Sequence, residues 1–167
     1  MRAAWVLALA VSITSWASAA TVDPADAWRP MYSYLGTWKT TRTGADGPVK
    51  MTRVYASAPT NHHLEITETS GGGRARAAVR GMVSFDPQRE VLVLRQFAAD
   101  GSASDLTFDS AVSTAERVVF LSPESDAART RITYERSGPK IFVERIEQAA
   151  GGSPFALVSE TRFERKD

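Results

Sequence analysis

The stretch FDPQREVLVLRQFAADG, residues 85–101, decides the fold class. It begins with an Asp-Pro turn, continues through a run of β-branched, aliphatic and aromatic residues at Val91–Phe97, and ends in an Asp-Gly turn. A short run of this kind between turn residues is typical of a strand in a hairpin. No connection on either side is long enough to hold a crossover helix, so neighbouring strands are expected to run antiparallel.

The same pattern continues from residue 36 to the end of the chain, with turn chemistry roughly every eight to twelve residues. We predict an all-β fold, an antiparallel up-and-down barrel of about ten strands, because closing such a meander removes the two edges of an open sheet. A barrel of this size has room for a ligand. The alternative is a flattened sandwich filled by the phenylalanine side chains. Turns are expected at residues 44–48, 58–61, 71–73, 86–88, 100–101, 113–114, 123–126, 137–139 and 151–154.

One short helix is expected in front of the barrel. Asp23 and Pro24 form a typical helix start, with an N-cap carboxylate followed by proline at the first helical position. The helix can run toward Tyr34 and is ended by Gly36. Pro30 either bends it or opens a second short turn, because proline inside a helix removes a hydrogen bond.

The N-terminus has the pattern of a signal peptide. Arg2 precedes an apolar run over Ala3–Ile13, and Ala17-Ser18-Ala19 supplies the small residues at which signal peptidase cleaves. The run is shorter than the roughly 20 residues of a membrane helix. There is no Cys for a lipid anchor and no twin-Arg pair. We expect residues 1–19 to be removed and residues 20–167 to be a single periplasmic or secreted domain with no integral membrane segment.

The net charge of the expected mature protein gives no general electrostatic attraction to a charged partner. Removing residues 1–19 lowers the 20 Lys and Arg to 19, against 19 Asp and Glu. A neutral balance argues against binding to nucleic acid. Arg74, Arg76 and Arg80 form a basic stripe on one face of an expected strand, and we interpret it as a solvated outer face that protects against wrong strand pairing.

Tyr34-Leu35-Gly36-Thr37-Trp38 carries a resemblance to a known family. A helix that runs into Leu-Gly-x-Trp at the start of the first strand resembles the lipocalin-like (calycin) barrels, and most closely the exported bacterial lipocalin-like families of unknown function. Those families also tend to carry the Asp-Pro and Asp-Gly turns of residues 85–101. The resemblance implies that Trp38 packs across the closed end of the barrel as a structural residue.

The histidines give little sign of a cofactor. Nitrobindins, a haem-binding branch that shares the Gly-x-Trp start, ligate iron through a histidine late in the chain. Here the sequence has no histidine after His62 and His63, so that ligand position has no counterpart. Adjacent strand residues point to opposite faces, so at most one of the two can face the interior. We predict no cofactor and no metal site. One histidine, His63, is a candidate for bonding a polar ligand group at the barrel mouth.

Arginine on apolar strand faces is the clearest ligand signal. A charge that points into a barrel needs a partner or a ligand anion, and the arginine fork suits a carboxylate. We predict Arg95 as the main polar anchor, with Arg53, Arg145 and Tyr55 also contributing to ligand binding. The faces that carry these residues are Val91-x-Val93-x-Arg95-x-Phe97, Ile141-x-Val143-x-Arg145 and Val49-x-Met51-x-Arg53-x-Tyr55.

The opposite orientation stays open for the same strands. Leu92 and Leu94 form an equally apolar face, in which case Arg95 faces solvent. The arginines can also pair within the protein, with Glu65, Glu144 or Glu160 as candidate partners.

These observations favour a binding module over an enzyme. No Gly-x-Ser-x-Gly elbow occurs, and Glu65 and Glu68 have opposite strand parity, as do Glu144 and Glu147, so no catalytic residue is predicted. The leading hypothesis is an exported barrel that binds a small, largely apolar molecule, with a carboxylate head as one option. The alternatives are an envelope interaction module whose barrel is filled by its own side chains, and a hydrolase using His62 or His63.

Overall fold

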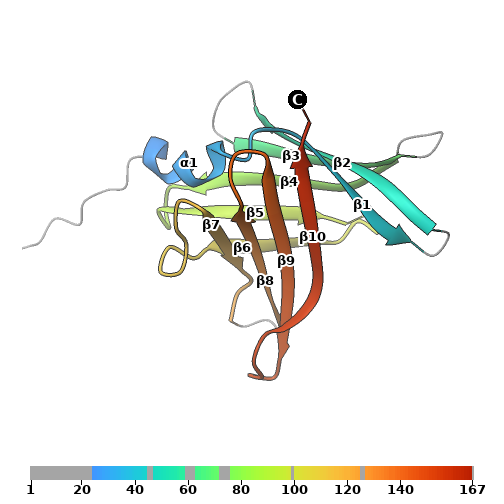
Figure 1. Cartoon of the computed structure of the whole chain (residues 1–167). Helices are drawn as coiled ribbons and strands as arrows, with labels where there is room; N and C mark the ends of the chain where they lie inside the picture. Colours follow the sequence, from blue (N-terminus) through green and yellow to red (C-terminus); the bar gives the residue numbers. More distant parts are fainter. Residues whose placement is uncertain are drawn as a thin grey trace, which may run out of the picture.

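The structure is a computed structural model, and its described residues form one closed barrel of ten antiparallel strands preceded by a short helix (Figure 1). The predicted fold class is therefore confirmed, and the sandwich alternative is wrong. The structure describes residues 24–44, 47–58, 63–71, 76–98, 100–124 and 127–166, with the backbone alone at residues 24–26, 44 and 76–80. The elements are α1 (Pro24–Tyr32), β1 (Gly36–Gly44), β2 (Gly47–Ser57), β3 (His63–Gly71), β4 (Arg76–Asp86), β5 (Val91–Phe97), β6 (Ala103–Phe108), β7 (Arg117–Leu121), β8 (Ala128–Arg136), β9 (Ile141–Ala150) and β10 (Ala156–Arg165).

The barrel is a meander that closes where β1 meets β10. Each strand pairs with its neighbours along the chain, and β1 pairs with β10. The ladder between β1 and β2 runs the whole length of β1, from Gly36 to Gly44. The closing ladder is much shorter, with the register pairs Trp38↔Arg165 and Lys39↔Glu164. The wall therefore has a weak seam between its first and last strands.

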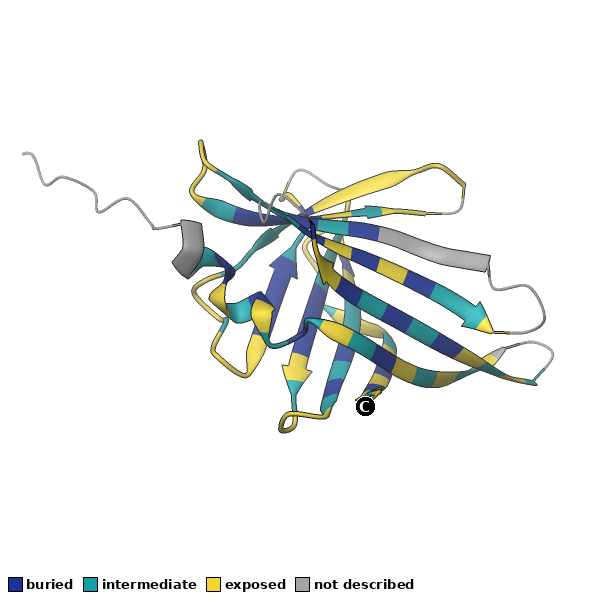
Figure 2. Ribbon diagram, turned by 90° about the horizontal axis from the view of Figure 1, so that it is seen from above, coloured by how far each residue is buried: buried dark blue, intermediate teal, exposed yellow. Residues whose placement is uncertain are grey.

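Buried residues alternate with more exposed ones along the strands (Figure 2). In β2, Met51, Arg53 and Tyr55 are buried while their neighbours are not. In β5, Leu92 and Leu94 belong to the core. Because the period of a strand is two, these positions fix which face of each strand points inward.

Aromatic side chains fill the end of the barrel next to α1. Phe142 lies at their centre, with its ring centroid 4.7 Å from those of Trp38 and Phe163 and 5.3 Å from that of Tyr34. Most of these contacts are edge-on, a favoured arrangement for aromatic pairs. This half of the interior is thus occupied by the protein's own side chains. The fully buried aromatic residues are Tyr34, Trp38, Tyr55, Phe120, Tyr134, Phe142 and Phe163.

The helix packs on this filled end. Trp28 and Met31 are buried and belong to the barrel core. Pro30 lies inside the last turn of α1, so the helix neither breaks there nor starts again, and it ends at Tyr32. A turn follows, in which the Tyr34 amide donates to the Met31 carbonyl over 3.0 Å.

Trp38 joins the helix end to the seam. Its Nε1 donates to the Tyr34 carbonyl over 2.7 Å, and the Arg165 guanidinium lies 4.7 Å from the centroid of its ring. Arg165 Nη2 also donates to the carbonyls of Leu35 and Ser33. Trp38 thus has the structural position that the sequence predicts, at the only part of the described seam where β1 and β10 pair.

The predicted signal peptide, residues 1–19, lies outside the described residues, as does His62. Within the part of the chain that the structure describes, no helix has the length and apolar character needed to cross a membrane.

Candidate functional site

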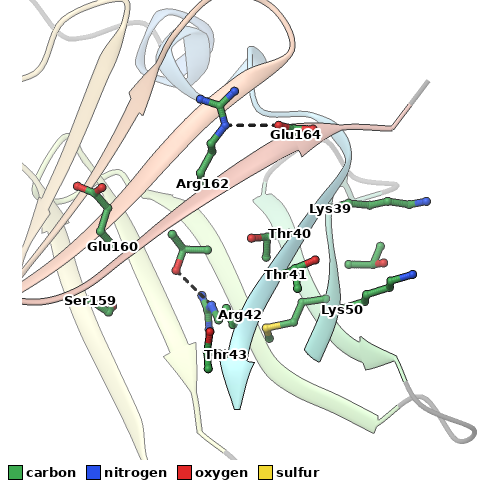
Figure 3. Close-up of a pocket in the computed structure, with 13 residues that line it drawn as sticks. Lys39, Thr40, Thr41, Arg42, Thr43, Lys50, Ser159, Glu160, Arg162 and Glu164 are labelled. Carbon is green, nitrogen blue, oxygen red and sulfur yellow. Dashed lines mark hydrogen bonds and ion pairs between the residues drawn. The ribbon is translucent and has the colours of Figure 1, made fainter. Parts of the chain in front are cut away.

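The candidate site is the opening that forms where β1 and β10 separate. Beyond Lys39↔Glu164 the two strands diverge, and residues 40–44 have no register partner on β10 (Figures 1 and 3). A cavity of about 940 Å³ lies here, and we call it the slot. Its lining comes from β1, β2 and β10 and consists of Lys39, Thr40, Thr41, Arg42, Thr43, Lys50, Met51, Thr52, Ser159, Glu160, Thr161, Arg162 and Glu164.

The lining combines residues from both faces of the wall. Strand alternation places Thr40 and Arg42 on the inner face of β1, together with Met51 of β2 and Thr161 of β10. The neighbouring residues of the same strands form the outer rim, which includes two lysines. The slot therefore leads from the surface to the inner face of the barrel.

Behind the slot lies a buried ion cluster centred on Arg53. Glu68 Oε2 accepts from Arg53 Nε at 2.7 Å, and the same oxygen is 2.6 Å from Arg53 Nη2. Glu144 binds the other side of the guanidinium, with Nη1–Oε1 2.5 Å and Nη2–Oε2 3.1 Å. The side chains of Arg53, Glu68 and Glu144 are 7 %, 1 % and 2 % exposed. The guanidinium also lies 4.3 Å from the ring centroid of Phe163.

The cluster joins strands on both sides of the seam. Glu68 lies on β3 and Arg53 on β2, whereas Glu144 lies on β9. β2 and β9 are separated in the wall by β1 and β10. The ion pairs therefore cross the inside of the barrel beside the short ladder between β1 and β10.

Arg53 remains charged inside the barrel. Burial by itself lowers the pKa of its guanidinium, but the neighbouring Tyr55 and Glu144 outweigh burial, and the pKa is raised well above its ordinary value. Removing ions from water costs several kcal/mol each and is offset only by close partners. The two carboxylates supply those partners.

Tyrosine hydroxyls line the edge of the cluster as neutral groups. Arg53 Nη1 lies 3.3 Å from the Tyr55 hydroxyl oxygen. Burial raises the pKa of Tyr55 to about 12 and that of Tyr134 well above its ordinary value. Both phenols are therefore protonated at neutral pH.

Arg42 completes the cluster from the slot side. Its Nε donates to Thr161 Oγ1 over 3.1 Å, across the slot (Figure 3). Its other nitrogens lie 3.5 Å from Glu144 Oε2 and 3.7 Å from Glu68 Oε1. These distances are longer than those made by Arg53, and the Arg42 side chain is 37 % exposed. Arg42 is thus the member of the cluster that solvent reaches.

Two of the predicted anchor arginines lie outside the barrel. Arg95 is exposed and pairs with Asp105 of β6, with Nε–Oδ1 2.7 Å and Nη2–Oδ2 2.6 Å. Arg145 pairs with Glu160, at 2.7 Å, and with Glu135. The inward orientation expected for these two residues is wrong, because the leucine face of β5 and the Phe142 face of β9 point inward instead.

The other predicted residues have mixed positions. Arg53 and Tyr55 are on the inner face and in contact with each other, as expected for that strand. His63 lies at the start of β3, away from the slot, with Nε2 3.6 Å from Glu65 Oε1. It lines a smaller cavity of about 270 Å³ next to α1, together with Trp28 and Tyr32. The side chains of the basic stripe, Arg74, Arg76 and Arg80, are outside the described part.

Sequence reasoning missed Arg42, Glu68 and Thr161 as members of the site, whereas it named Glu144 as one of three possible partners of the arginines. The alternation of residues along the strands did contain a signal for Glu68 and Arg42. Glu68 shares its strand face with Leu64 and Ile66, and Arg42 shares its face with Trp38. A charge in phase with core residues on several strands indicates an internal ion cluster as readily as a ligand anchor.

Comparison with known proteins adds no family assignment. No protein-family model matches the chain, and a search of curated proteins finds no significant match. Among the described residues, no three His, Asp or Glu side chains gather in a way that could hold a metal ion.

Proposed function

We propose that the protein is an exported, lipocalin-like barrel that binds a small amphipathic molecule in the slot between β1 and β10. The family resemblance rests on Leu35-Gly36-Thr37-Trp38 at the start of β1, and export rests on the apolar N-terminal pattern. The closed ten-strand barrel is compatible with both.

The slot is the observation that carries the proposal. Its cavity of about 940 Å³ lies within the range of roughly 300–1,000 Å³ that is usual for small-molecule sites. Met51, the threonine methyl groups and the aliphatic stems of the lysines and arginines supply apolar surface. Hydroxyls and charged groups at the same place supply polar contacts. A guest with both characters fits this lining better than a purely apolar one.

The aromatic filling of the helix end favours a second candidate, an envelope interaction module with no guest. In that case the ion cluster and the aromatic residues serve only to hold the barrel together. The two candidates differ in one observable, the binding of a small molecule at the slot.

Native mass spectrometry on the full chain, purified from the cells that make it, tests the proposal. We expect a small-molecule adduct that survives gentle desolvation. Thr40→Trp places an indole on the inner face of the slot and is expected to remove the adduct, because the ring fills the cavity. Thr67→Trp adds the same ring to an exposed position of β3, away from the slot lining, and is expected to keep it.

The two variants give clear outcomes. An adduct on the wild type and on Thr67→Trp, but not on Thr40→Trp, supports binding in the slot. A wild-type protein without an adduct, which also fails to bind any member of a panel of amphipathic molecules in solution, favours the filled module. An adduct that Thr40→Trp leaves unchanged places the ligand elsewhere and overturns the proposal.

A further inference from the structure

We propose that the slot takes up an extended acidic segment of a partner protein, which adds to the exposed edge of β10 as a further strand and sets its carboxylates against Lys39 and Lys50. This inference goes beyond the proposed function, because it adds a polypeptide partner to the small molecule. It rests on the unpaired strand edges, on the charge of the rim and on the apolar side chains at one end of the slot.

Two strand edges face each other across the slot without pairing. The ladder between β1 and β10 stops at Lys39↔Glu164. Residues 40–43 of β1 and residues 159–163 of β10 therefore have a strand partner on one side only, β2 and β9 respectively. On the slot side, their backbone groups have no ladder partner in the described sheet. Such an edge is a template for an added strand, which main-chain hydrogen bonds hold in an extended conformation.

Side chains, rather than backbone groups, connect the two strands beneath this opening. Continuing the register beyond Lys39↔Glu164 would set Arg42 directly opposite Thr161. At this position the Arg42 Nε donates to Thr161 Oγ1 over 3.1 Å on the inner face (Figure 3). An added strand has this bond beneath it. Because strand side chains alternate, every second side chain of the added strand points toward the bond and must be small.

The other charged groups of the slot lining are already compensated within the protein. Glu160 accepts from Arg145 Nε at 2.7 Å, and Glu164 lies 3.4 Å from Arg162 Nε. Arg42 belongs to the buried cluster, which is neutral because it contains two arginines and two carboxylates. These groups therefore leave little charge for a ligand to balance.

Lys39 and Lys50 are the charges of the lining that have no ion-pair partner among the described residues. Lys50 is in register with Thr41, two residues beyond Lys39, so the two lysines are diagonal neighbours on the outer face (Figure 3). Both are exposed. Neighbouring like charges on paired strands repel each other, and a carboxylate placed beside them relieves the repulsion. An extended segment with acidic side chains on its outer face is complementary in charge to this rim.

Exposed apolar side chains lie at the far end of the same edge. Leu157 and Val158 of β10 are each 58 % exposed, more than any other large apolar side chain that the structure describes. They lie at a β-bulge, where the register with β9 shifts between Leu157 and Ser159. A bulge bends its strand and interrupts regular pairing. The added strand therefore pairs with residues 159–163 and places an apolar residue on Leu157 and Val158.

A second copy of this barrel does not fit the same place. The β10 edge of each copy faces its own β1 across the slot, so a folded wall cannot enter. A single extended chain can enter, because it needs only the usual strand spacing of about 4.8 Å on either side. The partner is therefore a terminal or unstructured segment in which acidic residues alternate with small ones and an apolar residue follows at one end.

Three synthetic peptides test the inference by isothermal titration calorimetry at neutral pH, on the wild-type full chain after removal of any bound small molecule. The acidic peptide alternates glutamate with serine and has leucine at both ends. The basic peptide has lysine in place of glutamate, and the third is the acidic peptide with N-methylated amides. We expect the acidic peptide to bind at least about tenfold more tightly than either of the others. N-methylation removes main-chain donors without changing the charge, so it tests strand addition separately.

Two double variants test the role of the rim lysines. Lys39→Gln/Lys50→Gln removes both, and we expect it to weaken binding of the acidic peptide by about tenfold. Lys140→Gln/Lys166→Gln is the matched control, because it removes two exposed lysines that do not line the slot. We expect it to change the affinity by less than about threefold.

Amide hydrogen exchange locates the bound peptide on the wild-type protein. Because an added strand occupies backbone groups that now lack a ladder partner, we expect the acidic peptide to slow exchange at residues 40–43 and 159–163. Protection at other strands alone overturns binding in the slot.

Each remaining outcome also decides. Equal binding of the acidic and N-methylated peptides overturns strand addition, and equal binding of the acidic and basic peptides overturns the charge preference. Equal effects of the two double variants overturn the role of Lys39 and Lys50. If the rim variant does not fold, the three peptides on the wild type still decide. Absence of binding by all three overturns the inference, whereas a small-molecule adduct on the native protein would still support the proposed function.

Discussion

Arg53 and Glu144 form a two-point ion pair inside the barrel, although 91 residues separate them in the sequence. The pair connects β2 to β9, and the two strands that lie between them in the wall are β1 and β10. The closing ladder between β1 and β10 has register pairs only near Trp38 and Lys39. The ion cluster therefore supplies from the inside a connection that backbone pairing does not supply at the seam.

Replacing Arg53 with methionine is expected to destabilise the protein strongly. Arg53→Met keeps most of the side-chain length but leaves Glu68 and Glu144 buried without their main partner. Breaking a buried ion pair in this way costs about 3–5 kcal/mol, because an uncompensated charge remains. Urea denaturation at neutral pH measures the loss in the free energy of unfolding.

Arg95→Met is the matched control for that change. Arg95 also makes a two-point pair with a carboxylate, Asp105, but on the exposed outer face. Its replacement is expected to leave the urea midpoint nearly unchanged, because exposed pairs contribute little. An Arg53→Met protein as stable as Arg95→Met would show that the cluster does not hold the seam.

The hydrogen bond of Trp38 is expected to be a second source of stability at the seam. Trp38→Phe keeps an aromatic ring but removes the Nε1 donor and leaves the buried Tyr34 carbonyl without it. We expect a loss of about 1–3 kcal/mol, the cost of an unsatisfied buried acceptor. Thermal unfolding followed by circular dichroism measures it. Tyr32→Phe, at a side chain that is 52 % exposed, should leave the melting temperature unchanged.

The wall of this barrel follows from local chemistry in the sequence. The Asp-Pro and Asp-Gly turns on either side of Val91–Phe97 end one strand and start the next, and the same logic holds for the other hairpins. Short connections leave antiparallel neighbours as the only option. The number of strands, their order and the short helix could therefore be predicted.

The inward face of each strand could not be predicted by the same reasoning. Parity shows which residues share a face, but Val91 and Val93 oppose Leu92 and Leu94 with equal apolar character. Which of the two faces points inward depends on contacts with other strands, and these contacts exist only once the barrel has closed. Arg42 and Glu144, for example, are 102 residues apart and meet only because β1 and β10 close the barrel. For this reason the sequence could not place Arg95 and Arg145 on the outer face, where the structure has them.

Gly36 is expected to be required by its backbone conformation. Its φ is +122°, a region that side chains other than glycine rarely adopt, and a Cβ there would lie 3.5 Å from Arg165 Nη2. Gly36→Ala should cost about 1–3 kcal/mol of strain. Chemical denaturation measures the free energy of unfolding of Gly36→Ala and of a control variant, Gly71→Ala, and so tests whether backbone strain causes the loss. At Gly71 a Cβ meets only an ordinary contact, with Lys50 O at 3.5 Å, and the expected change is within about 1 kcal/mol. Equal losses in the two variants would contradict the strain argument.

Alkaline pH is expected to unfold the barrel through its buried tyrosines. Burial raises the pKa of Tyr55 to about 12, whereas an unfolded tyrosine has a pKa of about 10. Below pH 10 both states keep the proton, and the stabilisation is fully present. Between pH 10 and 12 the unfolded chain loses its proton while the folded protein retains it, so the free energy of unfolding falls with rising pH. For a shift of about two units the total is about 3 kcal/mol from this residue.

Tyr55→Phe isolates that contribution, because phenylalanine has no proton to lose. Urea denaturation at pH 9 and at pH 11.5 should show a smaller decline in the free energy of unfolding for Tyr55→Phe than for the wild type. Tyr134, whose pKa burial also raises, continues to contribute in both proteins. Tyr32→Phe removes a tyrosine from outside the barrel and controls for the loss of one phenol. A Tyr55→Phe protein whose stability declines as steeply as that of the wild type would mean that the Tyr55 hydroxyl titrates in the folded barrel as it does in the unfolded chain.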